Sequence, residues 1–398
     1  MDKVEELLTR GVANIIPGKT ELEQLLKSDK KINVYFGIDP TATKIHLGHA
    51  VPLRKLQKFA EMGHNVTFLI GDFTALIGDT SDKDSERPVL TPEQIEENFQ
   101  TYKKQAEKIL DFTKVKVRHN SDWLKKLTFE EIVKLSHAFS LNDFISRELI
   151  RKRLSENKNI GLAETQYPMM QGYDSYFLDT DLQIGGTDQT FNMQAGRTLQ
   201  KKWRNKESFV LSTEFLMGTD GRKMSKTWGN AIWLDDEPNG MYAKVMSLND
   251  DLIASYFLLA TDLSMGAVKD IEEELKKDKN PMLAKKDLAR QIVKELHGDS
   301  EAEKAEKNFE RTVQKGELPE NVPTVHIDNP EKPIDEILVE TGLVPSKSEA
   351  KRVINQGGTF VEGTRIINPN EIFSVVAPAS GATVSVGPIK FVKVRWDK

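Results

Sequence analysis

Cysteine is absent from this chain of 398 residues. Its absence excludes a disulfide-stabilised secreted fold, a cysteine-ligated zinc or iron–sulfur centre and a thiol-based catalyst. No stretch approaches the roughly 20 apolar residues that span a bilayer. The first residues, MDKVEELLTRGVANIIPG, carry acidic side chains and lack the continuous apolar segment of a secretory signal. We therefore expect a cytoplasmic protein with no membrane partner.

An excess of basic residues is also missing, because 56 lysines and arginines stand against 61 aspartates and glutamates, for a formal net charge of -5. This balance argues against diffuse coating of nucleic acid, but it leaves room for a local basic face that binds RNA. Hydrophobic residues make up 38% of the chain and charged residues 29%, as in globular proteins. At roughly 150 residues per domain, the length predicts two to three domains.

The first third of the chain has the pattern of an α/β unit. Alternating apolar residues in INVYFGID predict a buried strand, and a helical apolar repeat follows HLGH until Gly63 ends it. NVTFLIGD predicts a second strand, so strand, helix and strand would form a right-handed crossover in a parallel sheet. Such sheets bind ligands at the carboxyl ends of their strands.

Further elements follow in the middle of the chain. Thr128 and Glu131 have the spacing of a capping box at the start of a helix. DLQIGGTDQTFN predicts a strand, a glycine-rich turn and a helix, and SFVLSTEFL precedes the loop GTDGRKMSKTWGN. Both turns are candidates for contact with a ligand.

The last part of the chain predicts two more domains. From Met241 to Thr312 the pattern is helical, charged and rich in Ala and Leu, whereas GELPENVPTVHIDNPEKP is dense in proline and polar residues and predicts an extended connection. Helix signals and the alternating TVSVGPIKFVKVRW then indicate a small α+β module. We expect domains over residues 1–230, 231–318 and 333–398, with a linker over 319–332.

Two histidines, His46 and His49, lie beside Gly48 where the first predicted strand gives way to a helix. Imidazole donors, close approach at glycine and the amides of a helix N-terminus favour phosphate binding. Solvated or capping histidines are an equally ordinary explanation of the bare pair. A metal pair is the weakest interpretation, because neither cysteine nor an HExxH pattern completes a tetrahedral site.

Two lysines, Lys223 and Lys226, flank Met224 and Ser225 in a loop of small residues after Asp220. Ammonium groups on such a loop can close over a triphosphate and neutralise the charge that grows in phosphoryl transfer. Most surface lysine pairs are only solvated. The functional interpretation gains weight from the histidine motif upstream in the same α/β chain.

These motifs occur together with several others along the chain. They are YFGIDPT from Tyr35, HLGH from His46, Asp79, QYPMMQGYD from Gln166, GGTDQ from Gly185 and KMSKT from Lys223. In order and spacing the set resembles the bacterial tyrosyl-tRNA synthetases, which are class I aminoacyl-tRNA synthetases, over nearly the whole chain. Leu47 and Thr227 replace the usual Ile and Ser of two motifs and keep their chemical character.

The resemblance implies a fold and an assembly. It implies a Rossmann-like catalytic domain with a helical dimerisation insertion around Thr128 to Arg153, an α-helical domain on the anticodon side and a small module like that of a ribosomal small-subunit protein. A homodimer is expected.

In the last module, Lys347, Lys351 and Arg352 recur on one side of a predicted helix. Such a basic face is often only solvated, but here we expect it to bind tRNA.

The activity implied is that of a tyrosine–tRNA ligase. L-Tyrosine would be activated by ATP with Mg²⁺ to tyrosyl-adenylate and pyrophosphate, and tyrosine would then pass to the 3′ end of tRNA(Tyr). No prosthetic group and no protein-held metal are expected. A substrate carboxylate is already ionised at neutral pH, so the enzyme must supply positioning and charge stabilisation rather than a nucleophile.

The family match also assigns roles to residues. The substrate phenol would lie between Tyr35 and Asp174, both of which can hydrogen-bond a hydroxyl. The substrate ammonium would be held by Asp79, Tyr167 and Gln171, with Gln189 near the substrate carboxylate. Tyr167 and Gln171 are four residues apart and would share one helix face. Each of these residues also has a purely structural explanation. Tyr35 could be a core aromatic residue and Asp174 a buried, paired carboxylate. Tyr167 and Gln171 could form a solvated polar helix face.

ATP would contact a second set of residues, and the mobile cations Lys83 and Arg87 would help late in activation. Without the resemblance, a charged loop would be interpreted as solvated, and a GG sequence as an ordinary turn. The residues expected around ATP are Gly37, Asp39, Thr41, His46, Gly48, His49, Gly186, Asp188, Lys223, Met224, Ser225 and Lys226. Those expected to stabilise charge in the reaction are Thr41, His46, His49, Lys83, Arg87, Lys223 and Lys226.

Two rival functions remain at this point. Tryptophan-specific relatives share the scaffold, but they lack the last module, and the pair Tyr35 and Asp174 suits a phenol better than an indole. A noncatalytic RNA-binding protein could keep the fold, but intact histidine and lysine motifs argue against it. Amino-acid-dependent exchange of pyrophosphate into ATP separates the three.

Overall fold

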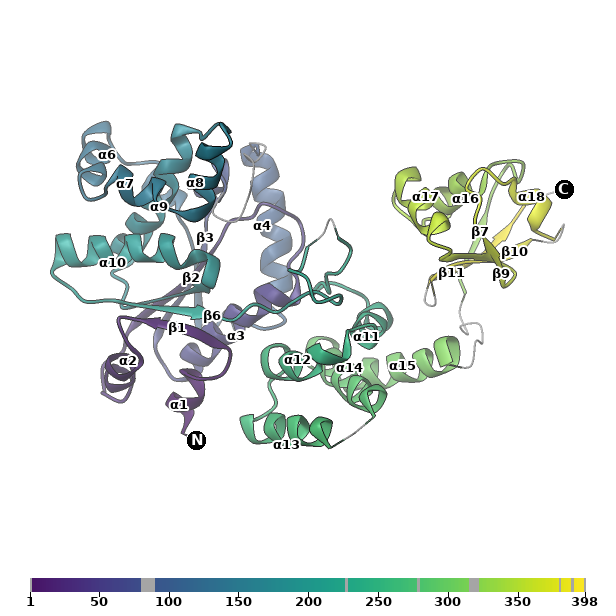
Figure 1. Cartoon of the computed structure of the whole chain (residues 1–398), viewed down its shortest axis with the longest axis horizontal. Coiled ribbons are helices and arrows are strands. Elements are labelled where there is room, and N and C mark those ends of the chain that lie inside the picture. Colours follow the sequence, from purple (N-terminus) through teal and green to yellow (C-terminus); the bar gives the residue numbers. More distant parts are fainter. Residues whose placement is uncertain are drawn as a thin grey trace. The chain divides into compact units, whose positions relative to one another are not determined.

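The computed structural model describes residues 2–79, 90–225, 228–277, 280–314, 322–378, 381–387 and 390–396. Contacts between residues divide the chain into two compact units. The first comprises residues 1–236 and 247–288, and the second comprises residues 237–246 and 289–398. Figure 1 traces the elements of both. Within the described ranges, no helix has the length and apolar character needed to cross a bilayer.

A six-stranded sheet organises the first unit. Its order is β1-β6-β5-β2-β3-β4, and every neighbouring pair is parallel except β1 and β6. The strands are β1 (Val12–Ile16), β2 (Asn33–Ile38), β3 (Asn65–Ile70), β4 (Val115–His119), β5 (Leu182–Gly186) and β6 (Phe209–Thr213). From β2 the chain adds β3 and β4 on one side, and it then adds β5 and β6 on the other side. The crevice at the carboxyl ends of β2 and β5 is thus the place where such a sheet binds ligands.

The predicted strand–helix–strand unit is confirmed. Strand β2 is buried on both faces, as the covered strand of a parallel sheet must be. Helix α3 (Leu47–Glu61) follows at His46 and buries Leu53, Leu56 and Phe59 completely. It ends just before Gly63, whose φ of 83° lies in the left-handed region that glycine adopts easily. Strand β3 then pairs in parallel with β2.

Other helices cover this sheet, and α9 and α10 pack closely together on it. The capping box predicted at Thr128 and Glu131 is present at the start of α6, where the Glu131 amide donates to Thr128 Oγ1. Besides α3, the α-helices described in this unit are α1 (Lys3–Leu7), α2 (Lys19–Leu26), α4 (Pro92–Ala106), α5 (Ser121–Leu124), α6 (Phe129–Ser136), α7 (Leu141–Ile145), α8 (Glu148–Ser155), α9 (Leu162–Phe177), α10 (Thr190–Arg204), α12 (Ile253–Ala260), α13 (Met265–Lys276) and the part of α14 (Pro281–His297) up to Leu288.

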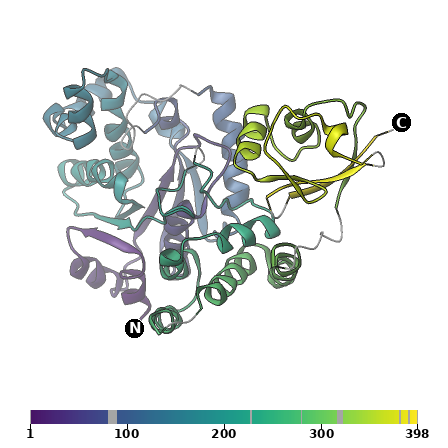
Figure 2. The ribbon, with the colours of Figure 1, turned by 45° about the vertical axis from the view of Figure 1, so that its right-hand side comes forward.

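The second unit begins with helices and ends in a small sheet, as Figure 2 shows from another side. Its helices are α11 (Pro238–Met246), the part of α14 (Pro281–His297) from Ala289 onward, α15 (Asp299–Phe309), α16 (Ile334–Glu340), α17 (Lys347–Asn355) and α18 (Phe373–Val376). The strands are β7 (Thr324–His326), β8 (Thr359–Val361), β9 (Thr364–Ile366), β10 (Ala382–Val386) and β11 (Lys390–Arg395). The predicted α+β ending is confirmed.

Part of the predicted linker belongs to this sheet. Strand β7 lies inside residues 319–332 and pairs in parallel with β11, and Ile327 is buried in the core of the module. The pattern of proline and polar residues hid a strand of three residues, because so short a strand carries almost no periodicity. The boundaries expected at residues 230, 318 and 332 stay predictions.

Candidate active site

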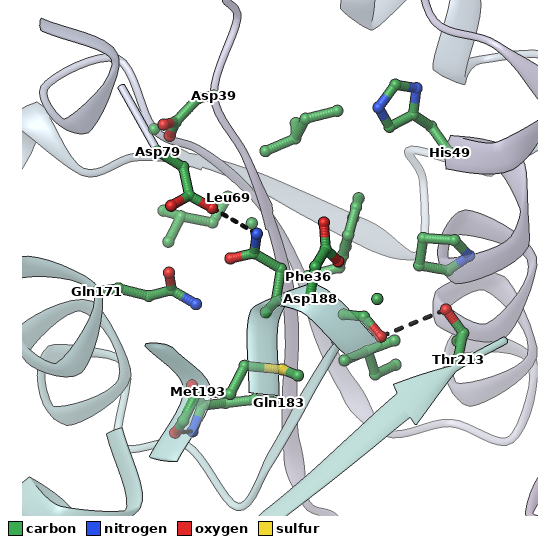
Figure 3. A pocket seen from close by; sticks show the side chains of 18 of the residues that line it. Phe36, Asp39, His49, Leu69, Asp79, Gln171, Gln183, Asp188, Met193 and Thr213 are labelled. Carbon is green, nitrogen blue, oxygen red and sulfur yellow. Dashed lines mark hydrogen bonds between the residues drawn. The ribbon is translucent and has the colours of Figure 1, made fainter. Parts of the chain in front are cut away.

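A pocket of about 330 Å³ opens at the carboxyl ends of β2 and β5, within the size range of small-molecule sites. Its walls come from the two strands, the start of α3, one face of α9 and the loop after β6. Figure 3 shows Asp39, Asp79, Gln171 and Asp188 around this space. The predicted site residues that line it are Tyr35, Gly37, Asp39, Thr41, His46, Gly48, His49, Asp79, Tyr167, Gln171, Asp174, Gly186, Asp188, Gln189, Lys223 and Met224.

One end of the pocket is a buried polar cluster. The Tyr35 hydroxyl donates to Gln183 Oε1 over 2.9 Å. Asp174 accepts from Trp123 Nε1 over 2.7 Å and from Asn120 Nδ2 over 3.1 Å. Burial raises the pKa of Asp174 to about 8, although the two donors lower it. This carboxyl group is therefore mostly protonated at neutral pH.

The two groups predicted to face a phenol thus lie in one pocket, but each already has protein partners. Gln183, Asn120 and Trp123 were not predicted. Gln183 is a fully buried amide in an apolar strand, and a polar residue in such a run is a signal that could have been noticed. Asn120 follows β4 at the carboxyl edge of the sheet, where ligand-binding residues are expected.

Acidic groups gather at a second part of the pocket. Asp39 accepts from the Tyr167 hydroxyl over 2.9 Å and from Thr74 Oγ1 over 2.8 Å. Asp79 accepts from Gln189 Nε2 over 2.6 Å, a bond drawn in Figure 3. Two carboxylates and several neutral oxygens suit a cationic ligand. Asp39, which we expect at ATP, thus bonds to Tyr167, which we expect at the substrate ammonium, and both roles stay predictions.

The histidine motif forms a stacked pair at the start of α3. The rings of His46 and His49 lie 3.9 Å apart, and both line the pocket. Gly48 is required here, because a Cβ atom at this position would lie 2.9 Å from the His46 ring. The His46 amide donates to His49 Nδ1 over 3.4 Å, which assigns the proton of His49 to Nε2.

Both imidazoles are neutral at physiological pH. Burial, followed by repulsion from His49 and Lys223, lowers the pKa of His46 to about 2. Burial and Lys223 lower the pKa of His49 to about 4. The pair can therefore donate hydrogen bonds to a phosphate, but it does not bring positive charge.

Positive charge comes from the loop after β6. Lys223 Nζ lies 3.8 Å from Asp188 and 5.3 Å from the centre of the Phe215 ring. A β-bridge between Met217 and Lys223 makes this segment a hairpin. The side chain of Lys223 is about half exposed, at 49%, so it can reach a bound ligand. Lys223 therefore lies beside Asp188, and we expect both residues around ATP.

The other residues of this motif are only partly in view. Met224 lines the pocket, and the Ser225 amide donates to Asn230 Oδ1 over 2.8 Å. Lys226, Lys83 and Arg87, three of the expected cations, lie outside the described residues.

The basic residues predicted to bind tRNA lie on α17, in the second unit. Their side chains are more than half exposed, as a nucleic-acid contact requires. Each also has a carboxylate neighbour, so the charge of this face is partly balanced within the module. The pairs are Lys347 with Glu336 at 2.8 Å, Lys351 with Asp335 at 3.8 Å and Arg352 with Glu349 at 2.6 Å.

Solved structures share this fold. One is the C-terminally truncated mitochondrial tyrosyl-tRNA synthetase of Aspergillus nidulans, with a TM-score of 0.66, 24% identity and coverage of 77% of this chain and 93% of that one. Another is the tyrosyl-tRNA synthetase of Archaeoglobus fulgidus complexed with L-tyrosine, with a TM-score of 0.61, 23% identity and coverage of 77% and 100%. At these identities the likeness concerns the fold.

Sequence comparisons identify the family. Residues 27–314 match the model of tRNA synthetases class I (W and Y), and residues 314–382 match that of the tyrosine–tRNA ligase SYY-like C-terminal domain. The tyrosine–tRNA ligase of Thermotoga maritima is 40% identical over 98% of this chain and 96% of its own length. That of Haemophilus influenzae is 38% identical over 98% and 96%. The chain therefore belongs to the tyrosyl-tRNA synthetases of the class I (W and Y) family.

Proposed function

We propose that this chain is a tyrosine–tRNA ligase, which activates L-tyrosine with ATP and then transfers it to the 3′ end of tRNA(Tyr). The observation that supports it most is a single pocket with two unlike ends. Asp174 and Tyr35 lie at the buried end, whereas His46, His49 and Lys223 lie at the other. An aromatic hydroxyl and a triphosphate need these two environments side by side.

Recognition of tyrosine would rest on an exchange of hydrogen bonds at the buried end of the pocket. The phenol would donate to Asp174 and accept from Tyr35, which would release its bond to Gln183. A ring without the hydroxyl would make neither bond, and each bond contributes about 0.5–1.5 kcal/mol. The ammonium would lie among Asp79, Tyr167, Gln171 and Asp39, and the carboxylate near Gln189.

Activation would be an in-line displacement at phosphorus. A tyrosine carboxylate oxygen forms a bond to the α-phosphorus, the bond from that phosphorus to the bridging oxygen breaks, and magnesium pyrophosphate leaves. Mg²⁺ enters with ATP as substrate. Thr41, His46 and His49 would donate hydrogen bonds to the phosphates as neutral groups. Lys223 and Lys226 would stabilise the departing charge.

The rest of the ATP site follows from the same arrangement. Asp188 would accept from the ribose hydroxyls beside Gly186, and Gly37 lines the pocket where the nucleotide would pass. Lys83 and Arg87 are proposed as the late-acting cations that the motif match implies. These assignments rest on the motifs and on the shared lining of the pocket.

The transfer step needs tRNA, for which we propose Lys347, Lys351 and Arg352 on the exposed face of α17 as phosphate contacts. The cytoplasm is the proposed cellular location, because bacterial tRNA is charged there. A match between the C-terminal residues and a tyrosine–tRNA ligase domain supports the role of this module.

We also propose a homodimer formed through the helices between Thr128 and Arg153. Large apolar side chains are exposed on α6, α7 and α8, and such a cluster on a soluble domain marks an interaction surface. Phe129 is 81% exposed and Leu141 is 63% exposed. The substitution Leu141→Lys should shift the molecular mass measured by light scattering toward that of one chain.

Pyrophosphate exchange into ATP tests the activity. Exchange that depends on tyrosine, with phenylalanine and tryptophan far weaker, is the expected result. Exchange with tryptophan would instead favour the related specificity. A chain that is folded, binds tRNA and gives no exchange with any amino acid would refute the proposal and favour a noncatalytic RNA-binding role.

A further inference from the structure

A buried amide side chain lies behind the loop that carries Lys223. Asn230 is only 3% exposed, although it follows a loop at the mouth of the pocket. None of the roles assigned to the pocket uses it. Its contacts show why an amide is buried at this position.

Asn230 joins the two arms of the hairpin. On one arm, its Nδ2 donates to Asp220 Oδ1 over 2.7 Å, and its backbone oxygen accepts from the Thr219 amide over 3.0 Å. On the other arm, Nδ2 also donates to the Lys223 carbonyl over 3.2 Å, and Oδ1 accepts from the Ser225 amide over 2.8 Å. One side chain thus fixes the backbone on both sides of Lys223.

Only a short amide meets these demands. The Asp220 carboxylate needs a donor, while the Ser225 amide needs an acceptor, and a carboxylate or an aliphatic side chain supplies only one or neither. The bond from Asn230 is the main reason why the pKa of Asp220 is lowered to about 2. Gly218 is matched to it, because a Cβ atom there would lie 2.3 Å from Asn230 Nδ2.

The residues after Asn230 connect this loop to the histidine motif. The Leu47 amide donates to the Ile232 carbonyl, and the Leu234 amide donates to the Ile45 carbonyl, each over 2.9 Å. These bonds bracket His46. Asn230 therefore lies between the loop that it holds and a backbone pairing that fixes the position of the imidazoles.

We infer that Asn230 is a positioning residue that sets the distance between Lys223 and the pair of imidazoles, so that both meet the same triphosphate. This inference rests on the proposed function. It assigns no contact with substrate to Asn230. Its effect should appear in steps that involve the phosphates and should be absent from the binding of tyrosine.

The substitutions Asn230→Ala and Asn230→Asp test this role. Asn230→Ala removes three hydrogen bonds of the side chain, so the rate of tyrosyl-adenylate formation at subsaturating Mg·ATP should fall by about tenfold or more. Equilibrium binding of tyrosine should stay unchanged. Asn230→Asp should be as damaging, because it places a second carboxylate against Asp220.

The double variant Asp220→Asn with Asn230→Asp is the decisive measurement. It restores the bond with donor and acceptor exchanged and should recover part of the rate that Asn230→Asp loses. Gln200→Ala is the matched control. It removes an equally buried amide, which donates to the Ser175 carbonyl over 2.8 Å. It should lower the thermal midpoint without changing the KM for ATP.

Three results would overturn the inference. They are an unchanged rate in Asn230→Ala, an equal loss of tyrosine affinity, or a double variant no better than Asn230→Asp. If the parent protein itself shows no tyrosine-dependent exchange, the proposed function fails separately. Binding of Mg·ATP, measured by calorimetry for the parent protein and Asn230→Ala, would then still decide whether Asn230 organises a triphosphate site.

Discussion

Replacing Asp174 by asparagine tests how the pocket holds its buried carboxyl group. The pKa is raised to about 8 from an ordinary value of 3.8, so between these pH values the native state keeps a proton that the unfolded chain has released. The free energy of unfolding must therefore fall as the pH rises through this window. Asparagine is neutral throughout. Relative to the parent protein, the variant should gain up to about 1.4 kcal/mol per pH unit between pH 5 and pH 7.

Urea unfolding followed by circular dichroism at pH 5, 6 and 7 measures this difference. The matched control is Asp335→Asn, which removes a comparably buried carboxylate that has the Lys351 ammonium 3.8 Å away. We expect the control to lower the free energy of unfolding, because the Lys351 ammonium loses its carboxylate neighbour. If the stability difference between Asp174→Asn and the parent protein were constant over this range, the carboxyl group would have to be ionised in the folded state. The assignment of a protonated Asp174 would then be wrong.

Substitutions at Tyr35 and His49, and one truncation, probe other parts of the protein. Tyr35→Phe removes the hydroxyl, so selectivity for tyrosine over phenylalanine in pyrophosphate exchange should fall by about five- to tenfold; an unchanged ratio would place the phenol elsewhere. His49→Asn keeps a neutral donor and should retain more of the activation rate than His49→Ala, and equal losses would contradict a role as neutral donor. Ending the chain at residue 314, so that β7 is removed with its sheet, should preserve exchange but weaken tRNA charging by roughly ten- to hundredfold. Equal charging by both chains would show the module to be dispensable.

Periodicity predicted the elements better than it predicted their partners. The strands β2 and β3, the helix α3 and the capping box of α6 follow from local patterns. The bond between Tyr35 and Gln183 does not, although these residues face each other in the register of β2 and β5. The register between strands that lie almost 150 residues apart depends on the packing of the whole sheet. No local pattern carries it.

The motifs predicted which residues line one pocket, but not which of them carry a charge. His46 and His49 carry no charge at neutral pH, since burial lowers both of their pKa values. Among the described residues that line the phosphate end of the pocket, Lys223 therefore supplies the positive charge. It lies on a hairpin, and its side chain is half exposed. A charge on such a hairpin stabilises a departing pyrophosphate effectively only if its position is fixed before the reaction. Otherwise the free energy needed to move it into place would offset the electrostatic stabilisation. Asn230 lies where that fixing must occur.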